Sequence, residues 1–141
     1  MQDKYKNILV NTLKAFCGLC DREGLRWYMA FGSAIGAVRH GGIIPWDDDV
    51  DVYMPREDFR KFLALQAPDG YDIVHLSRSN QPLPYTYAKF CDAHSIIWEQ
   101  RKYPCRIGVF IDVFPLDEVP AAEAPALRKV YLQRLVAYKR G

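Results

Sequence analysis

Acidic side chains crowd one short stretch of this sequence. Asp47, Asp48, Asp49 and Asp51 lie within five residues, and the last of them belongs to the apolar stretch 50–54. Carboxylates this close raise one another's pKa, so such a cluster is stable in a folded protein only where a cation neutralises it. We therefore expect these side chains to hold a divalent metal ion.

A distant acid could complete the same metal site. If residues 49–54 form a strand, its side chains alternate, so Asp49 and Asp51 project from one face while the intervening valines point into the core. Asp112 interrupts the apolar run 108–114, where an unpaired charge is costly. If the two strands lie side by side, the three carboxylates surround one or two ions. Hard oxygen ligands of this kind suit Mg²⁺ or Mn²⁺ shared with the phosphates of a substrate.

Phosphate-binding groups are expected before and after the acids. Gly32 would let the backbone approach a phosphate closely, and Ser33, as the N-cap of a short helix, would add its hydroxyl to the free N–H groups of the helix start. Arg39 could clamp a pyrophosphate with its guanidinium or form a salt bridge with the acidic loop. Lys89, in the predicted strand 85–91, could reach a leaving phosphate.

The elements that must position these groups form a mixed pattern of helices and strands. Apolar residues at spacings of three and four predict a helix over 4–22 with Gly24 as its C-cap. An aromatic-rich segment, 26–31, predicts a first buried strand. The remaining expected elements are helices at 33–39, 57–66 and 121–140 and strands at 49–54, 71–76, 85–91, 95–100 and 107–114.

Composition favours a single globular domain over residues 1–141. Half of the residues are hydrophobic, and the net charge of +2 is too small to indicate a nucleic-acid partner. The sequence contains no apolar run long enough for a transmembrane segment and no signal-peptide core at its start, so we expect a cytoplasmic protein. The predicted final helix runs to the end of the chain, which indicates a piece of a longer protein. The oligomeric state is not predicted.

The stretch from Phe31 through Val52, with its Gly-Ser, Pro-Trp-Asp-Asp-Asp-Val-Asp-Val and intervening Gly-Gly, resembles the signature of the LicD family. The similarity continues through 55–59 and 111–117. That family includes bacterial phosphocholine transferases and fukutin-type proteins, and it belongs to the nucleotidyltransferase superfamily. The resemblance implies an α+β fold of the polymerase-beta type, a mixed β-sheet flanked by helices. It also implies that the family's domain continues beyond residue 141, on the acceptor side.

Carried over by position, the resemblance implies that Asp49, Asp51 and Asp112 are catalytic metal ligands and that Gly32 and Ser33 contact phosphate. Asp47 matches a further acid of the motif, whose role would be metal binding or loop support. For Asp48 a solvated or capping carboxylate is favoured, because its strand parity is opposite to that of Asp49.

The implied reaction is transfer of a substituted phosphoryl group, such as phosphocholine or a polyol phosphate, from a CDP-linked donor. The acceptor would be a hydroxyl of a cell-surface glycan, in teichoic acid, lipopolysaccharide or a capsule precursor. The metal would neutralise charge as CMP departs, and one of the carboxylates, or a metal-bound alkoxide, would remove the acceptor's proton.

Two other functions remain open at this point. The same acids would serve a nucleotidyltransferase that moves NMP from an NTP. A non-catalytic Ca²⁺ module is the third reading, although calcium loops usually space their oxygen ligands along one loop with a glycine at its bend.

Overall fold

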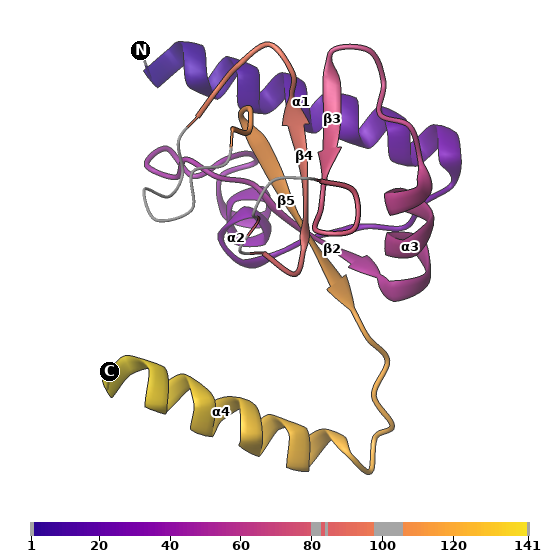
Figure 1. The fold of residues 1–141 in the computed structure, drawn as a ribbon. Helices are drawn as coiled ribbons and strands as arrows, with labels where there is room; N and C mark the ends of the chain where they lie inside the picture. Colours follow the sequence, from indigo (N-terminus) through magenta and orange to yellow (C-terminus); the bar gives the residue numbers. More distant parts are fainter. Residues whose placement is uncertain (1, 80–82, 84, 98–105, 141) are drawn as a thin grey trace.

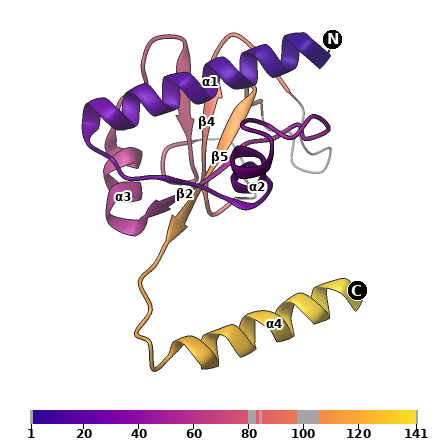
Figure 2. The same ribbon diagram turned by 180° about the vertical axis from the view of Figure 1, so that it is seen from behind.

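A computed structural model describes residues 2–79, 83, 85–97 and 106–140. Figures 1 and 2 show a body of helices packed on one sheet and a C-terminal helix set apart from it. In chain order the elements are α1 (Gln2–Glu23), β1 (Tyr28–Met29), α2 (Phe31–Arg39), β2 (Asp51–Pro55), α3 (Arg56–Ala64), β3 (Tyr71–Val74), β4 (Ala88–Asp92), β5 (Phe110–Leu116) and α4 (Ala124–Arg140). The expected mixed α+β class is confirmed.

The sheet is mixed, with strand order β1-β2-β5-β4-β3. Strands β2 and β5 run parallel at its centre, and every other pairing is antiparallel. The two parallel strands come from distant parts of the sequence, so the centre of the sheet forms only when these parts meet.

One face of the sheet is covered by α1 and α3, as the two opposite views show (Figures 1 and 2). The core lies between them and contains the buried side chains Phe16, Phe62, Val52, Phe90 and Ile111. Phe16 contacts the rings of both Phe62 and Phe90 at centroid distances of 5.8 Å. Because strand side chains alternate, the neighbours of the buried strand residues project from the opposite face, which these helices leave open.

Most of the predicted helices and strands are present in the structure, and the exceptions differ mainly in where an element begins or ends. The first helix ends as expected before Gly24, whose φ of 65° is readily adopted by glycine. The expected buried strand 26–31 is wrong: β1 has two residues at the edge of the sheet, and Tyr28 is exposed. The aromatic residues of this segment therefore lie at a partly exposed edge of the sheet and are not buried on both of its faces. Of the predicted strand 95–100, the described part forms a single bridge between Ile97 and Ile107.

The predicted cap of the second helix is also wrong. α2 begins at Phe31, two residues earlier than expected, and its N-cap Ala30 has no capping side chain. Ser33 lies inside the first turn, and its hydroxyl is used elsewhere. Phe31, the first residue of α2, adopts a φ of 45°, a left-handed value rarely taken by a non-glycine residue.

The final helix is present, but its described apolar side chains are not part of the core. Leu127, Val130, Tyr131 and Leu132 are exposed. Over the described residues, no helix combines the length and the apolar character needed to cross a membrane.

Candidate catalytic site

The open face of the sheet brings Asp51 and Asp112 side by side. They are directly paired across the parallel strands β2 and β5, and the backbone N–H of Asp112 donates to the carbonyl of Val50 at 3.0 Å. The burial pattern of β2 alternates, with Val52 and Met54 buried and Asp51 half-buried. The two strands are therefore neighbours in the sheet, as the predicted metal site required.

Lys89 extends this row across a third strand. On β4 it is paired with Asp112, and its Nζ donates a hydrogen bond to Asp112 Oδ1 at 2.6 Å. Lys89 is only 1% exposed and Asp112 8%. The ammonium also lies 3.4 Å from the ring centroid of Phe110 and 4.5 Å from that of Tyr85. Lys89 is therefore a buried counter-ion of Asp112, in the same row as the acid that it neutralises.

The loop before β2 holds a second group of carboxylates. Asp47, Asp48 and Asp49 each place a carboxylate oxygen within 4.8 Å of the other two. Asp49 lies in the loop before β2, so the prediction that it is part of this strand is wrong. The chain is irregular here, and the hydroxyl of Tyr5, from α1, donates a hydrogen bond to the carbonyl of Asp48 at 2.8 Å.

Electrostatics link the loop acids to the strand acids. Burial raises the pKa of Asp49 to about 6, helped by a hydrogen bond and repulsion from Asp47 and by the charges of Asp48 and Asp112. Burial also raises the pKa of Asp51 to about 7, with repulsion from Asp49, Asp112 and Asp47 adding to it, while Lys89 partly offsets the effect. Negative charge is therefore in excess at this point of the fold.

The start of α2 is tied to this site by two contacts. Ser33 Oγ accepts a hydrogen bond from the backbone N–H of Asp51 at 2.9 Å. A Cβ added to Gly32 would lie 2.9 Å from Asp47 Oδ2, so the absence of a side chain at Gly32 makes room for that carboxylate. The predicted phosphate-binding turn is thus adjacent to the acids, and the positive end of the helix dipole faces an anionic group there.

Arg39 lies at the other end of the same helix. It is exposed in the last turn of α2, away from Gly32 and Ser33. Within the described part of the chain, no ion pair joins it to the acidic loop. Its expected role as a phosphate clamp stays a prediction.

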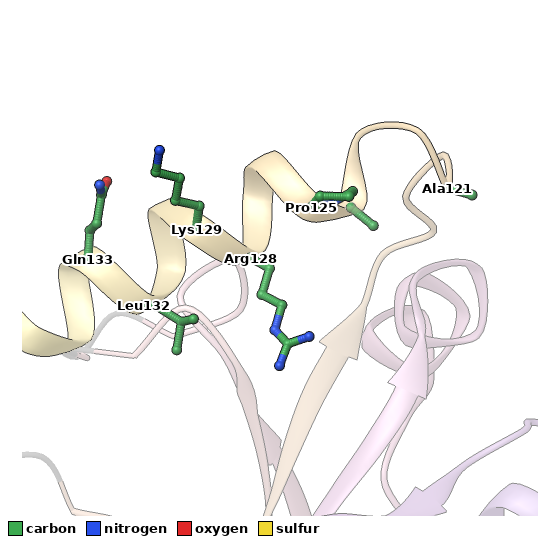
Figure 3. A pocket seen from close by; sticks show the side chains of 7 residues that line it. Ala121, Pro125, Arg128, Lys129, Leu132 and Gln133 are labelled. Carbon is green, nitrogen blue, oxygen red and sulfur yellow. The ribbon is translucent and has the colours of Figure 1, made fainter.

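A hollow of about 240 Å³ opens at the acids. Tyr5, Asp48, Asp49, Ile97, Phe110 and Asp112 line it. A larger hollow of about 820 Å³ is lined by α4 and the turn before it alone, with Arg128 and Leu132 pointing toward the rest of the molecule and Lys129 and Gln133 pointing away (Figure 3). Because one helix and its preceding turn form that hollow by themselves, we place the candidate catalytic site at the hollow beside the acids.

The donor set fits Mg²⁺ or Mn²⁺. It offers carboxylate oxygens from two strands and one loop, and the raised pKa values of Asp49 and Asp51 indicate a site that a cation would stabilise. Asp51 and Asp112 would provide ligands from the sheet, and Asp49, with Asp47 and Asp48 nearby, from the loop.

Sequence reasoning missed the aromatic side chains beside this row. Tyr53 and Phe114 each follow an acid by two residues on the same strand, and they are paired across β2 and β5 as the acids are. The available signal was that Tyr53 and Phe114 each lie two residues after an acid, which places their side chains on the same face of the strand as Asp51 and Asp112. The register that makes them a pair could not be inferred from the sequence.

Comparison with known proteins agrees with this geometry. The family profile described as LicD/FKTN/FKRP, nucleotidyltransferase domain, matches residues 24–133. The chain is 35% identical over 118 residues to the lipopolysaccharide cholinephosphotransferase LicD of Haemophilus influenzae, covering 80% of this chain and 43% of that protein. It is 36% identical over 66 residues to the ribitol 5-phosphate transferase FKRP of Homo sapiens, covering 47% of this chain and 13% of that protein.

A similar match is found to an uncharacterised protein, RT0683 of Rickettsia typhi, at 38% identity over 70 residues, 48% of this chain and 23% of that protein. The chain thus spans less than half the length of these curated relatives. The profile covers most of the chain, including the acidic loop, β2 and β5. The chain belongs to the LicD family of nucleotidyltransferase-like domains.

Proposed function

We propose that this chain carries the catalytic domain of a metal-dependent transferase for substituted phosphoryl groups. The donor would be a CDP-linked alcohol, with phosphocholine or a polyol phosphate as the transferred group. The acceptor would be a hydroxyl of a cell-surface glycan such as lipopolysaccharide, teichoic acid or a capsule precursor. Support for the transferred group comes from relatives whose names specify choline phosphate and ribitol 5-phosphate transfer.

The observation that carries the proposal is the pairing of Asp51 with Asp112 on the parallel strands, beside the start of α2. Hard carboxylate ligands next to a helix N-terminus suit a divalent metal shared with a pyrophosphate. Such a metal would neutralise the charge that develops on the phosphates during transfer.

The residues of the chain would act mainly by positioning. The Ser33 hydroxyl fixes the backbone of Asp51, and Lys89 fixes the carboxylate of Asp112, so both ligands are oriented before substrate binds. In the reaction, the acceptor oxygen forms a bond to the phosphorus of the transferred group. The bond from that phosphorus to the bridging oxygen breaks, CMP leaves with the electron pair, and a carboxylate of the site takes the acceptor's proton.

The test is release of CMP. The protein with Mg²⁺, CDP-choline or CDP-ribitol and a glycan acceptor should release CMP, and chelation of the metal should stop it. Asp51→Asn should lower the rate by at least two orders of magnitude, while the exposed Asp21→Asn control on α1 should not change it. Release that is unchanged in Asp51→Asn would refute the proposal.

A second candidate is transfer of NMP from an NTP, which the nucleotidyltransferase-type domain profile favours. The same acids would hold the metal. Incubation with CTP or ATP would then release pyrophosphate, whereas the CDP-alcohol would give no CMP. Calorimetric comparison of CTP, ATP and CDP-choline would separate the two reactions.

A further inference from the structure

A row of aromatic rings lies directly beside the row of charged residues on the open face of the sheet. Asp51 pairs with Asp112, and two residues further along the same strands Tyr53 pairs with Phe114. A strand advances about 3.3 Å per residue, so the two rows are roughly 6 to 7 Å apart. Any group that extends along the strands from a phosphate at the acids therefore reaches these rings.

The rings form one continuous cluster across two strands and a helix. The centroid distances are 6.4 Å from Tyr53 to Phe114, 5.2 Å from Phe31 to Tyr53 and 5.6 Å from Phe31 to Phe114. Tyr87, which immediately precedes β4, continues the cluster, with its ring centroid 4.4 Å from that of Phe114. We call these four residues the aromatic shelf.

The shelf is partly open to solvent. Phe31 is 55% exposed, and Tyr53, Phe114 and Tyr87 are half-buried. Phe31 reaches the shelf from a backbone with a φ of 45°, a strained conformation for a non-glycine residue. Strained backbones of this kind persist mainly where a side chain must be placed for function, so the position of Phe31 is a second observation in favour of a ligand.

The electrostatics of this face favour a cation. Asp51 and Asp112 lie in the next row, Asp49 lies in the loop just before β2, and aromatic faces attract positive charge. The same face already holds one cation on its rings, since Lys89 Nζ lies 5.3 Å from the centroid of Tyr87 and 3.4 Å from that of Phe110.

A polyol would be a poor occupant, because its hydroxyl groups need hydrogen-bond partners. Phe31 and Phe114 offer only carbon, which leaves the hydroxyl groups of the two tyrosines. A quaternary ammonium group has no hydrogen-bond donor to satisfy, and its methyl groups pack well on rings. In phosphocholine this group lies two carbons beyond the phosphate ester oxygen, a reach comparable to the spacing of the two rows.

We propose that the aromatic shelf binds the quaternary ammonium end of the transferred group and so selects phosphocholine over polyol phosphates. This inference rests on the proposed function, because it assumes that the phosphate lies at the acids. It makes Phe31, Tyr53 and Phe114 the residues that determine donor specificity.

Equilibrium binding to unreactive probes tests the shelf without turnover. Calorimetry with Mg²⁺ would compare phosphocholine with its neutral isostere 3,3-dimethylbutyl phosphate, in which carbon replaces the charged nitrogen, and with ribitol 5-phosphate and CMP. A cation on rings is worth about 0.5 to 2 kcal/mol, so phosphocholine should bind roughly 3- to 30-fold more tightly than the isostere.

Phe114→Leu keeps an apolar side chain and should remove most of this preference while leaving CMP affinity unchanged. Trp46→Leu, which alters an exposed aromatic residue outside the shelf, is the matched control and should keep the preference. Circular dichroism verifies that each variant folds.

Equal affinity for phosphocholine and its isostere, or no binding of either, would overturn the shelf assignment. Weakened CMP binding in Phe114→Leu with unchanged phosphocholine binding would also overturn it, since the shelf would then hold the nucleobase. These results are distinguishable from failure of the proposed function. CMP release from CDP-ribitol without a choline preference would leave the transferase in place and remove only the shelf, whereas no CMP release from any CDP-alcohol would remove the transferase.

Discussion

Replacing Lys89 by methionine should strongly destabilise the metal-free protein. The substitution keeps an apolar side chain of similar length but removes the cation that lies 2.6 Å from Asp112 Oδ1. Asp112 would remain as a buried carboxylate among aromatic rings. Removing one partner of a buried ion pair costs about 3 to 5 kcal/mol, because the other charge is left uncompensated.

The exposed ion pair on α3 provides the matched control. Lys61 lies 3.2 Å from Glu57, one helical turn away, and both side chains are mostly exposed. Lys61 also lies 3.9 Å from the buried Asp58, but Asp58 would keep its closer partner Arg26 at 2.7 Å. Exposed pairs at this spacing are worth about 0.3 to 0.5 kcal/mol. Lys61→Met should therefore change the free energy of unfolding by less than about 1 kcal/mol, although both substitutions remove one positive charge.

Urea unfolding followed by circular dichroism would measure both variants, with EDTA and with Mg²⁺. A divalent metal should restore part of the stability of Lys89→Met, since it would replace the missing positive charge and bind only the folded state. The double variant Lys89→Met/Asp112→Asn should be more stable than Lys89→Met alone, because the stranded carboxylate is gone.

The reasoning would be refuted if Lys89→Met cost no more than Lys61→Met. It would equally fail if the double variant were as unstable as the sum of its two single substitutions. In either case the ion pair would contribute little to stability, and the phosphate-binding role of Lys89 that the sequence indicated would be the better account of this residue.

Three further predictions concern the same region. In the folded metal-free protein the pKa of Asp51 is raised from 3.8 to about 7, so the folded state binds more protons than the unfolded state between about pH 4 and pH 7, and the free energy of unfolding should fall as pH rises through this window. Asp51→Asn should flatten this pH dependence in thermal melts. A pH dependence no different from that of Asp21→Asn would contradict the prediction. A Cβ at Gly36 would lie 2.5 Å from the carbonyl oxygen of Gly42, whereas a Cβ at Gly18 would meet nothing within 4 Å. In urea titrations Gly36→Ala should therefore lower the free energy of unfolding by about 1 to 3 kcal/mol, and Gly18→Ala should raise it by about 0.5 to 1 kcal/mol. Changes of the same sign in both variants would count against this packing. Ser33→Ala removes the acceptor for the Asp51 N–H, so it should cost about 1 kcal/mol of stability and weaken Mg²⁺ binding in calorimetry; unchanged metal affinity would show that this bond does not position the carboxylate.

The helices of the body could be predicted because their signals are local. The apolar spacing of α1 and the stop at Gly24 need no knowledge of the rest of the fold, and Pro55 marks the boundary between β2 and α3. β1 was misjudged because aromatic composition alone does not distinguish a buried strand from an edge.

The candidate site was predictable in its residues but not in its contacts. An acid in the apolar run of β5 indicated a partner of opposite charge, and the structure supplies Lys89, whose Nζ lies 2.6 Å from Asp112 Oδ1. The pairing of Lys89 with Asp112 depends on the antiparallel register of β4, which no local pattern specifies. Ser33 was expected at a helix cap, but its hydroxyl bonds to Asp51 because α2 starts two residues earlier.

The central parallel pair has a consequence for how this protein would acquire the proposed divalent cation. The two sheet carboxylates are brought together only by contact between segments far apart along the chain, which is a slow, non-local step in folding. A nascent chain that has not yet added β5 offers Asp51 and the loop acids but not Asp112, so it should retain divalent ions poorly. Loading of the proposed metal would thereby be postponed until assembly of the sheet is finished, so retention of the ion would report completed folding.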